Sequence, residues 1–471
     1  MSPIIAAFVF AIGIAGCFFF DREQARVSKA LWIPTVWLFF CSSRSLAQWL
    51  GTGGMDAAAN DASAYLEGNP IDRNFLIVLQ VVALIVLINR GRRVGSILRE
   101  NWAIGLFFLY AAVSMAWSDY PFVTFKHWIK GIGDVMMVLI VLTEPDIFEA
   151  IKRLVTRLGF VLVPLSLLFI WYYPALGRTA TMDWTPEAVG VATQKNGLGE
   201  LCDIYGLALL WRFRNAYNDR KDPNRRRRML VLGAVLAMIV WLLHLCNSMT
   251  SICALCMASV VMLLSTRPAF RRRPAFVHLV IGGVLVVSLY ALFFQSSGGL
   301  IASLGRNPTL TGRTEVWPEL IKLVNNRLVG VGYESFWLGP RLERVWVITQ
   351  GLRINEAHSG YVEILITLGW IGLVMMGVLI ATGYRNVIAA YRRDPNANSL
   401  RIAWFLAPLI TGFTEAAFRM MGLTWIVFLL ATANSQWDAA RKTGRHGRPT
   451  SQLQRPPEEP RPVIEGAAVR G

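Results

Sequence analysis

His358 is the residue whose place in the sequence best suits acid–base chemistry. The chain has five histidines, and His358 ends a long polar loop directly before an apolar segment, where an imidazole can meet both water and a lipid-soluble substrate. Histidine has a pKa near working pH, so its neutral ring can take a proton from a hydroxyl group and release it again. His358 is therefore a candidate general base, with capping of the following helix at the membrane surface as the alternative.

Several basic side chains lie in loops on the same side of the apolar segments as His358. They are Lys126, Lys130, Arg178, Lys195, Arg313, Arg341, Arg344, Arg353 and Arg419. Lys126 and Lys130 are four residues apart, so on a helix they share a face and form a basic edge with His127. The planar arginine fork binds phosphate oxygens in pairs and could stabilise a diphosphate leaving group. Ordinary contact with lipid headgroups is the alternative for Arg341, Arg344 and Arg419.

Polar residues also occur inside apolar segments. Asn196, Glu200 and Asp203 are spaced i, i+4 and i+7, and Arg44 lies about two helical turns inside the end of another segment. Ionisable groups at such depth are costly and usually face a partner or a cavity. Two readings are open: an ion pair of Arg44 with Glu200 or Asp203, and contact with a substrate.

The elements that carry these residues are predicted to be membrane-spanning helices. Apolar side chains make up 54% of the 471 residues and charged ones 16%, whereas about a quarter of a soluble domain is charged. A helix needs about 20 apolar residues to cross the hydrocarbon core, and lipid leaves no partner for unpaired backbone groups. We predict an all-α polytopic membrane protein with about 12–13 spanning helices. The predicted spans are 3–20, 30–50, 74–89, 102–117, 127–142, 158–173, 196–211, 229–246, 250–264, 277–294, 360–382, 402–418 and 420–436.

The distribution of positive charge sets the predicted orientation. The net charge is +17, and 33 of the 47 Lys and Arg residues fall in alternate connections and the C-terminal tail. The positive-inside rule places those connections in the cytoplasm. The run Arg225 to Arg228 then anchors the topology near anionic lipid and is no nucleic-acid patch, and His358 faces the outer side of the membrane.

The sequence carries no pattern of a metal or cofactor site. All six cysteines fall in apolar spans, and Cys253 and Cys256 form a CxxC with no second ligand pair. HExxH, DxD and P-loop motifs do not occur. We expect no disulfide framework, no metal and no cofactor.

One connection is much longer than the others on its side. Residues 295–359 form an outward loop, and long loops often carry function. Its residues Val316, Trp317, Leu320, Ile321, Leu323 and Val324 recur at helical spacing, which predicts an amphipathic helix. We expect one transmembrane domain over 1–436, with short helices in this loop, and a disordered cytoplasmic tail over 437–471.

Several motifs in order along the chain resemble those of O-antigen ligases and Wzy-type polysaccharide polymerases. His358-Ser359, nine residues and then Gly369-Trp-Ile-Gly372 resemble the pattern H[NSQ]-x9-Gxx[GTV] of that family. Four further stretches also resemble family elements: Gly312-Arg313-Thr-Glu315-Val-Trp317 with Gly330-Val-Gly332-Tyr333, Gln194 to Gly199, Ser114 to Pro121, and Ser43 to Trp49 for the exopolysaccharide-production branch.

The resemblance implies a bundle and a reaction. It implies a metal-independent glycosyltransferase with a GT-C-like bundle that takes an undecaprenyl-diphosphate-linked oligosaccharide as donor. His358 would act as base on the acceptor, and Arg313 would hold the diphosphate. Lys195 stands where some relatives carry Arg, which puts its role in doubt. The remaining candidate substrate contacts are Asn196, Arg44, Lys126, Lys130, Arg341, Arg344, Arg353, Glu315 and Trp317.

Three functions follow as hypotheses. The first is polymerisation, in which one lipid-linked glycan is transferred onto another lipid-linked repeat. The second is ligation of the glycan to lipid A core or another lipid acceptor. The third is a transporter or flippase of lipid-linked sugars, against which stands the lack of interrupted inverted repeats. Membrane lipids, and a chain-length regulator with export proteins, are the expected partners, and nucleic acid is not.

Overall fold

The chain is helical through most of the part that the structure describes. The structure is a computed structural model that describes residues 1–21, 27–52, 68–180, 185–272, 275, 278–283, 285–286 and 313–435, without the side chains of 271, 272, 313 and 314. The longer helices are α1 (Pro3–Phe20), α2 (Trp32–Cys41), α6 (Pro70–Asn89), α7 (Gly91–Glu100), α8 (Trp102–Val113), α9 (Pro121–Leu142), α10 (Ile147–Tyr172), α12 (Lys195–Asn218), α13 (Arg225–Cys246), α14 (Met249–Ser265), α18 (Arg313–Lys322), α19 (Gly339–Ile348), α20 (Gly360–Arg393), α21 (Pro395–Thr411) and α22 (Leu423–Thr432). Short elements complete the described part: η1 (Lys29–Leu31), α3 (Leu46–Trp49), η2 (Ser114–Trp117), α11 (Pro174–Gly177), α15 (Pro268–Arg272) and the antiparallel pair β1 (Arg178–Ala180) and β2 (Pro186–Ala188).

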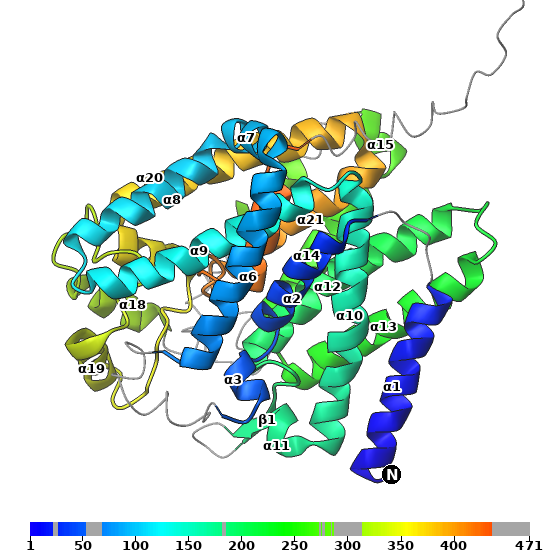
Figure 1. Ribbon diagram of the computed structural model, residues 1–471, viewed down its shortest axis with the longest axis horizontal. Helices are drawn as coiled ribbons and strands as arrows, with labels where there is room; N and C mark the ends of the chain where they lie inside the picture. Colours follow the sequence, from blue (N-terminus) through cyan, green and yellow to red (C-terminus); the bar gives the residue numbers. More distant parts are fainter. Residues whose placement is uncertain are drawn as a thin grey trace, which may run out of the picture.

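The helices form a bundle around α12 and α21 (Figure 1). α12 packs against α10, α13, α14 and α21, and α21 packs in turn against α14, α20 and α22. Large side chains from these helices are fully buried there, among them Tyr205, Trp211, Trp404 and Trp425. The predicted class, an all-α polytopic membrane protein, is confirmed.

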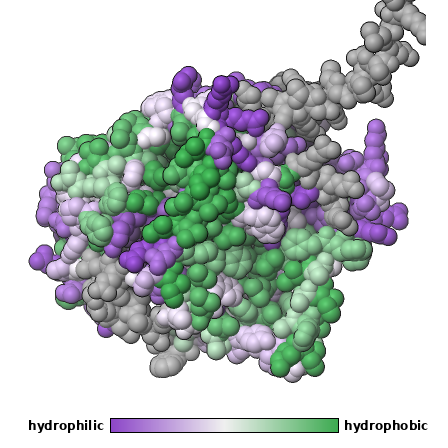
Figure 2. All heavy atoms as spheres, viewed as in Figure 1, coloured by the Kyte–Doolittle hydropathy of each residue, from purple (hydrophilic) through white to green (hydrophobic). Residues whose placement is uncertain are grey.

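Five described helices are long and apolar enough to cross a membrane: α1, α6, α10, α13 and α20. Shorter apolar helices are η1 with α2, α8 with η2, α14 and α22. Figure 2 shows apolar residues gathered over α6 and α1, and hydrophilic ones over α7. Exposed apolar side chains on α6, such as Val78, Leu84 and Ile85, would contact lipid tails in a membrane.

The helices lie close to the predicted spans, but α21 and the segment after α2 differ from them. The predicted span 402–418 ends early, because α21 stops at Thr411 and residues 412–422 turn back before α22. The predicted span 30–50 is interrupted, since α2 ends at Cys41 and α3 starts after Ser45, whose hydroxyl accepts from the backbone N–H of Gln48 in a capping box. The predicted span 277–294 and the tail 437–471 lie mostly or wholly outside the described residues.

α20 is a broken helix where a continuous one was predicted. Gly369 has φ 68° and ψ −166°, which interrupts the helix after nine residues. This region of φ/ψ space is accessible almost only to glycine. His358 lies two residues before the first half, 360–368, and the second half continues to Arg393.

Two short helices form the described part of the long loop. α18 follows the predicted amphipathic pattern, and α19 covers most of the stretch between Arg341 and Arg353. Their own small core contains Leu320, Phe336, Leu342 and Val345. The first part of the loop, 295–312, lies outside the described residues.

Candidate active site

His358 lies between carboxylates at the start of α20. Its Nδ1 is 3.0 Å from Oε1 of Glu356 and 3.6 Å from Oε2 of Glu415. The side chain is 24% exposed, so a substrate can reach the ring. The backbone of His358 has φ 48°, a left-handed conformation that is uncommon outside glycine and worth noting at functional sites.

Ala357, the residue before His358, is hydrogen-bonded through both its carbonyl and its backbone N–H. Trp317 Nε1 donates to the carbonyl of Ala357 at 2.8 Å, and the Ala357 N–H donates to Oε1 of Glu363 at 2.6 Å. Trp337 Nε1 donates to the other oxygen of Glu363 at 2.9 Å. Trp317 comes from the motif that begins at Arg313, so two motifs that are 40 residues apart meet at the backbone of the candidate base.

The turn 412–422 is tied to the start of α20. The N–H of Gly360 donates to the carbonyls of Gly412 at 2.8 Å and Glu415 at 2.9 Å. A Cβ at Gly360 would lie 2.6 Å from the Phe418 ring, so only glycine allows this approach. The early end of α21 therefore delivers Glu415 to His358.

Arg419 belongs to the same cluster. Its Nε lies 3.4 Å from Oε2 of Glu334 and its Nη1 3.6 Å from Oε2 of Glu356. Burial alone lowers the pKa of Arg419, but the carboxylates of Glu334, Glu363 and Glu356 outweigh it and raise that pKa above its usual value. The sequence left open a headgroup contact for Arg419, and the structure places its guanidinium among glutamates instead.

The predicted basic edge of α9 lies beside this cluster. His127 Nδ1 is 3.0 Å from the backbone carbonyl of Glu334, and Lys130 lies within electrostatic reach of Lys126 and Glu334. The ammonium of Lys126 lies 5.3 Å from the centre of the Phe122 ring. The structure thus brings the cations of α9 and the carboxylates around Arg419 to one end of the bundle.

The two glycines of the segment 330–332 pack against the break in α20. The N–H groups of Val331 and Gly332 donate to the carbonyls of Ile366 at 3.2 Å and Thr367 at 2.9 Å. A Cβ at Gly330 would lie 2.4 Å from the Thr367 oxygen, and one at Gly369 would lie 2.3 Å from the Leu328 oxygen. The nine-residue spacing in the His358 motif is therefore the length of the half-helix between the candidate base and this backbone contact.

Residues 114–121 support the same segment from the other side. Ser114 Oγ accepts a hydrogen bond from the N–H of Tyr333 at 3.0 Å, and Trp117 Nε1 donates to the carbonyl of Val329 at 3.2 Å. A Cβ at Gly332 would lie 2.6 Å from the Cβ of Ser118. Segments separated by more than 200 residues thus form one frame for His358.

α12 brings a further carboxylate toward the site. Glu200 lies within electrostatic reach of Glu415 and Glu356, while Lys195 at the start of the helix forms an ion pair with Glu187. Asn196 is half-buried next to Lys195. The predicted roles of Lys195 and Asn196 in substrate binding stay predictions.

Arg44 is buried and contacts backbone carbonyls. Its guanidinium donates to Leu176, and to Gly190 and Ala192 at 3.4 Å each. Among the residues that the structure describes, no ion pair joins Arg44 to a carboxylate of α12. Arg44 thereby fixes the segment that leads into α12, and its predicted substrate contact is not tested by this arrangement.

The remaining residues that were predicted to contact substrate lie on α18, on α19 or shortly after α19. Arg341 pairs with Asp119 and lies 5.4 Å from the Phe336 ring centre, and Arg353 lies 5.4 Å from the Trp346 ring centre. Glu315 is exposed, and Arg313 begins α18 with its side chain outside the described atoms. Arg344 lines an open groove, together with Leu323, Pro340, Glu343, Val347 and Ile348.

Glu356, His358 and Glu415 are also the described residues that could hold a metal ion. Their donor atoms lie within 4.8 Å of one another, and imidazole and carboxylate are ligands that divalent metals accept.

The sequence analysis did not predict Glu356, Glu415 or Glu334 as site residues, because single acidic residues in loops form no recognisable spacing. The signal available was Glu356 two residues before His358.

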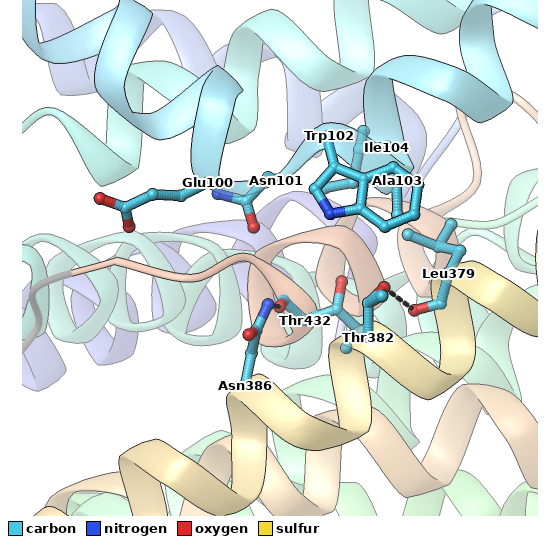
Figure 3. A pocket seen from close by; sticks show the side chains of 10 residues that line it. Glu100, Asn101, Trp102, Ala103, Ile104, Leu379, Thr382, Asn386 and Thr432 are labelled. Carbon is cyan, nitrogen blue, oxygen red and sulfur yellow. Dashed lines mark hydrogen bonds between the residues drawn. The ribbon is translucent and has the colours of Figure 1, made fainter.

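A separate small cavity lies between the junction of α7 with α8 on one side and the helices α20 and α22 on the other (Figure 3). Asn386 donates to the carbonyl of Thr432 at 3.0 Å, and Thr382 donates to that of Leu379 at 3.1 Å. None of the predicted site residues lines it.

Comparison with known proteins supports the resemblance inferred from the motifs. Residues 232–377 match the family model described as O-Antigen ligase, a range that contains His358, Trp317 and Gly369. The predicted resemblance to the O-antigen ligase family is confirmed. The chain is also 25% identical over 328 residues, covering 66% of its length and 72% of the relative's, to the exopolysaccharide production protein ExoQ of Rhizobium meliloti. Similarity to the O-antigen ligase family, together with the long apolar helices, supports a multi-pass membrane protein related to enzymes that act on polysaccharides.

Proposed function

We propose that the protein polymerises exopolysaccharide or O-antigen repeats at the periplasmic face of the bacterial inner membrane. The donor is a glycan linked to undecaprenyl diphosphate, and the acceptor is the nonreducing end of another lipid-linked repeat. The observation that carries this proposal is the anchored backbone at His358, whose neighbour Ala357 is hydrogen-bonded to both Trp317 and Glu363. A base must be held in position to act on one hydroxyl of a sugar.

The proposed reaction is a single displacement at the anomeric carbon of the donor. The imidazole takes the proton of the acceptor hydroxyl, the oxygen forms the new glycosidic bond, and the bond to the diphosphate oxygen breaks. Undecaprenyl diphosphate leaves with the bonding electron pair, and His358 later releases its proton to water. Arg313, Lys126 and Lys130 would stabilise the charge that develops on the diphosphate.

We propose that basic side chains, without a metal ion, stabilise the negative charge on the diphosphate. Arginine and lysine near the donor supply fixed positive charge for a diphosphate. Arg419 stays ionised among its glutamates and reduces the net negative charge next to His358. These contacts favour a reaction that needs no added divalent cation.

The deciding experiment uses the purified protein in liposomes with a synthetic undecaprenyl-diphosphate-linked oligosaccharide. His358→Ala should lower product formation by roughly a hundredfold or more, the usual contribution of a general base. His244→Ala is the matched control, because His244 is exposed on α13 and stacks loosely on Trp241. Full activity of His358→Ala at normal expression refutes the proposed base.

Polymerase and ligase share donor and leaving group, so the lipid-linked species in a deletion strain must separate them. Single repeats accumulate if a polymerase is lost, whereas long chains accumulate if a ligase is lost. A flippase would move labelled donor across the liposome membrane without forming a new glycosidic bond. Mass spectrometry of the lipid-linked glycans separates a polymerase from a ligase, and the leaflet in which the labelled donor is found identifies a flippase.

A further inference from the structure

Glu356 has its two carboxylate oxygens directed at two different partners. Oε1 lies 3.0 Å from Nδ1 of His358, and Oε2 lies 3.6 Å from Nη1 of Arg419. We propose that Glu356 is a positioning residue that holds the imidazole of His358 with Nε2 toward the acceptor hydroxyl, and that Arg419 holds Glu356. This inference rests on the proposed function, since it assigns a partner to the proposed base.

The backbone contacts fix the position of His358 but do not set the orientation of its ring. The hydrogen bonds to Ala357 fix the chain entering His358, and those of Gly360 fix the chain leaving it. The side chain still has two rotatable bonds, and its partial exposure shows that packing does not close every side. A carboxylate at Nδ1 selects one ring orientation and one tautomer.

Glu356 fits this role better than Glu415, the other carboxylate beside the ring. Glu356 is closer to Nδ1, at 3.0 Å against 3.6 Å. It is also buttressed by Arg419, whose Nε is in turn 3.4 Å from Glu334. The 3.0 Å approach lacks the alignment of a hydrogen bond, and catalytic hydrogen bonds that are poorly aligned in the free enzyme often tighten in the substrate complex.

Other charged groups surround the pair, and they define what a substitution changes. Glu415 and Arg419 face it from the turn 412–422, Glu334 stands behind Arg419, Glu363 lies on α20, and Glu200 comes from α12. Replacing Glu356 by glutamine removes one negative charge next to the ring and leaves these groups in place. An adjacent carboxylate favours the protonated ring, so its loss favours the neutral base at lower pH.

The test measures steady-state kinetics in liposomes as a function of pH. Glu356→Gln should lower kcat by about 10- to 100-fold, a part of the full contribution of the base, with KM changed less than about twofold. The acidic limb of the kcat profile should move to lower pH. Glu356→Asp should recover part of kcat, since it keeps the charge on a shorter side chain.

Glu319→Gln is the matched control, because Glu319 is exposed on α18 and pairs with Lys322 at 2.7 Å. It should leave kcat and the pH profile unchanged. The positioning role is refuted if Glu356→Gln keeps the wild-type kcat and pH profile, or if Glu356→Asp and Glu356→Gln lose thermal stability equally and show no shift of the acidic limb.

Failure of this inference is distinguishable from failure of the proposed function. If His358→Ala destroys transfer and Glu356→Gln does not, the base stands and its partner is wrong. If neither variant affects transfer, the proposed base is wrong as well. If the wild-type protein forms no glycosidic bond from the lipid-linked donor, the proposed function itself fails. If EDTA abolishes wild-type activity and Mn²⁺ or Mg²⁺ restores it, Glu356 acts as a metal ligand with His358 and Glu415, and the positioning role is overturned.

Discussion

Replacing Gly369 by alanine should disturb the protein far more than a glycine-to-alanine change in a helix normally does. Gly369 has φ 68° and ψ −166°, where an L-residue is strained by about 1–3 kcal/mol. The new Cβ would also lie 2.3 Å from the Leu328 carbonyl oxygen, so the segment 327–332 must move away. Forcing extra atoms into a packed site costs about 1–3 kcal/mol, which gives a total of about 2–6 kcal/mol.

Gly377→Ala is the control for this change. Gly377 lies on the second half of α20, and nothing is within 4 Å of the Cβ that alanine would add there. In a regular helix alanine is favoured over glycine by about 1 kcal/mol. The two variants should therefore change stability in opposite directions.

The assay is thermal unfolding of the detergent-solubilised protein, followed by transfer activity in liposomes. Gly369→Ala should lower the unfolding midpoint and reduce activity, because the N–H groups of Val331 and Gly332 donate to the half-helix 360–368 that follows His358. Gly377→Ala should raise the unfolding midpoint slightly and leave the activity unchanged. If the two variants unfold at the same temperature and are equally active, the backbone contact at Gly369 does not hold the site together.

Three further changes test the frame and the charges of the site. Trp317→Phe removes the donor to Ala357 and leaves that carbonyl without its indole partner, which costs about 1–3 kcal/mol of stability. The kcat should fall while the protein stays folded. An unchanged kcat would show that this hydrogen bond does not help to position His358. Arg313→Lys keeps the charge but loses the two-pronged contact, so donor turnover should fall, and unchanged turnover removes Arg313 from the site. Treatment of the purified protein with EDTA should leave transfer intact, whereas a loss reversed by a divalent cation would show that the cluster of Glu356, His358 and Glu415 binds a metal.

The sequence alone determined the class of the protein, most helix positions and the family resemblance. Apolar runs of spanning length admit few alternatives to helices in lipid, and the motifs around His358 and Arg313 are local in the chain. The start of α20 at Gly360, directly after His358, agrees with the predicted span. Periodicity could also predict α18, because one face of that helix covers the small core of the loop.

The tertiary structure decided what surrounds His358 and how it is held. Glu415 reaches His358, and Arg419 reaches Glu356, because α21 ends at Thr411. Hydropathy does not reveal this end, because Glu415 is the one charged residue in the predicted span 402–418. The break at Gly369 is set by the approach of Leu328 from a distant segment. Such contacts depend on residues that are far apart in sequence and carry no periodic signal, so only the folded chain shows that Glu356, Glu415 and Trp317 converge on the candidate base.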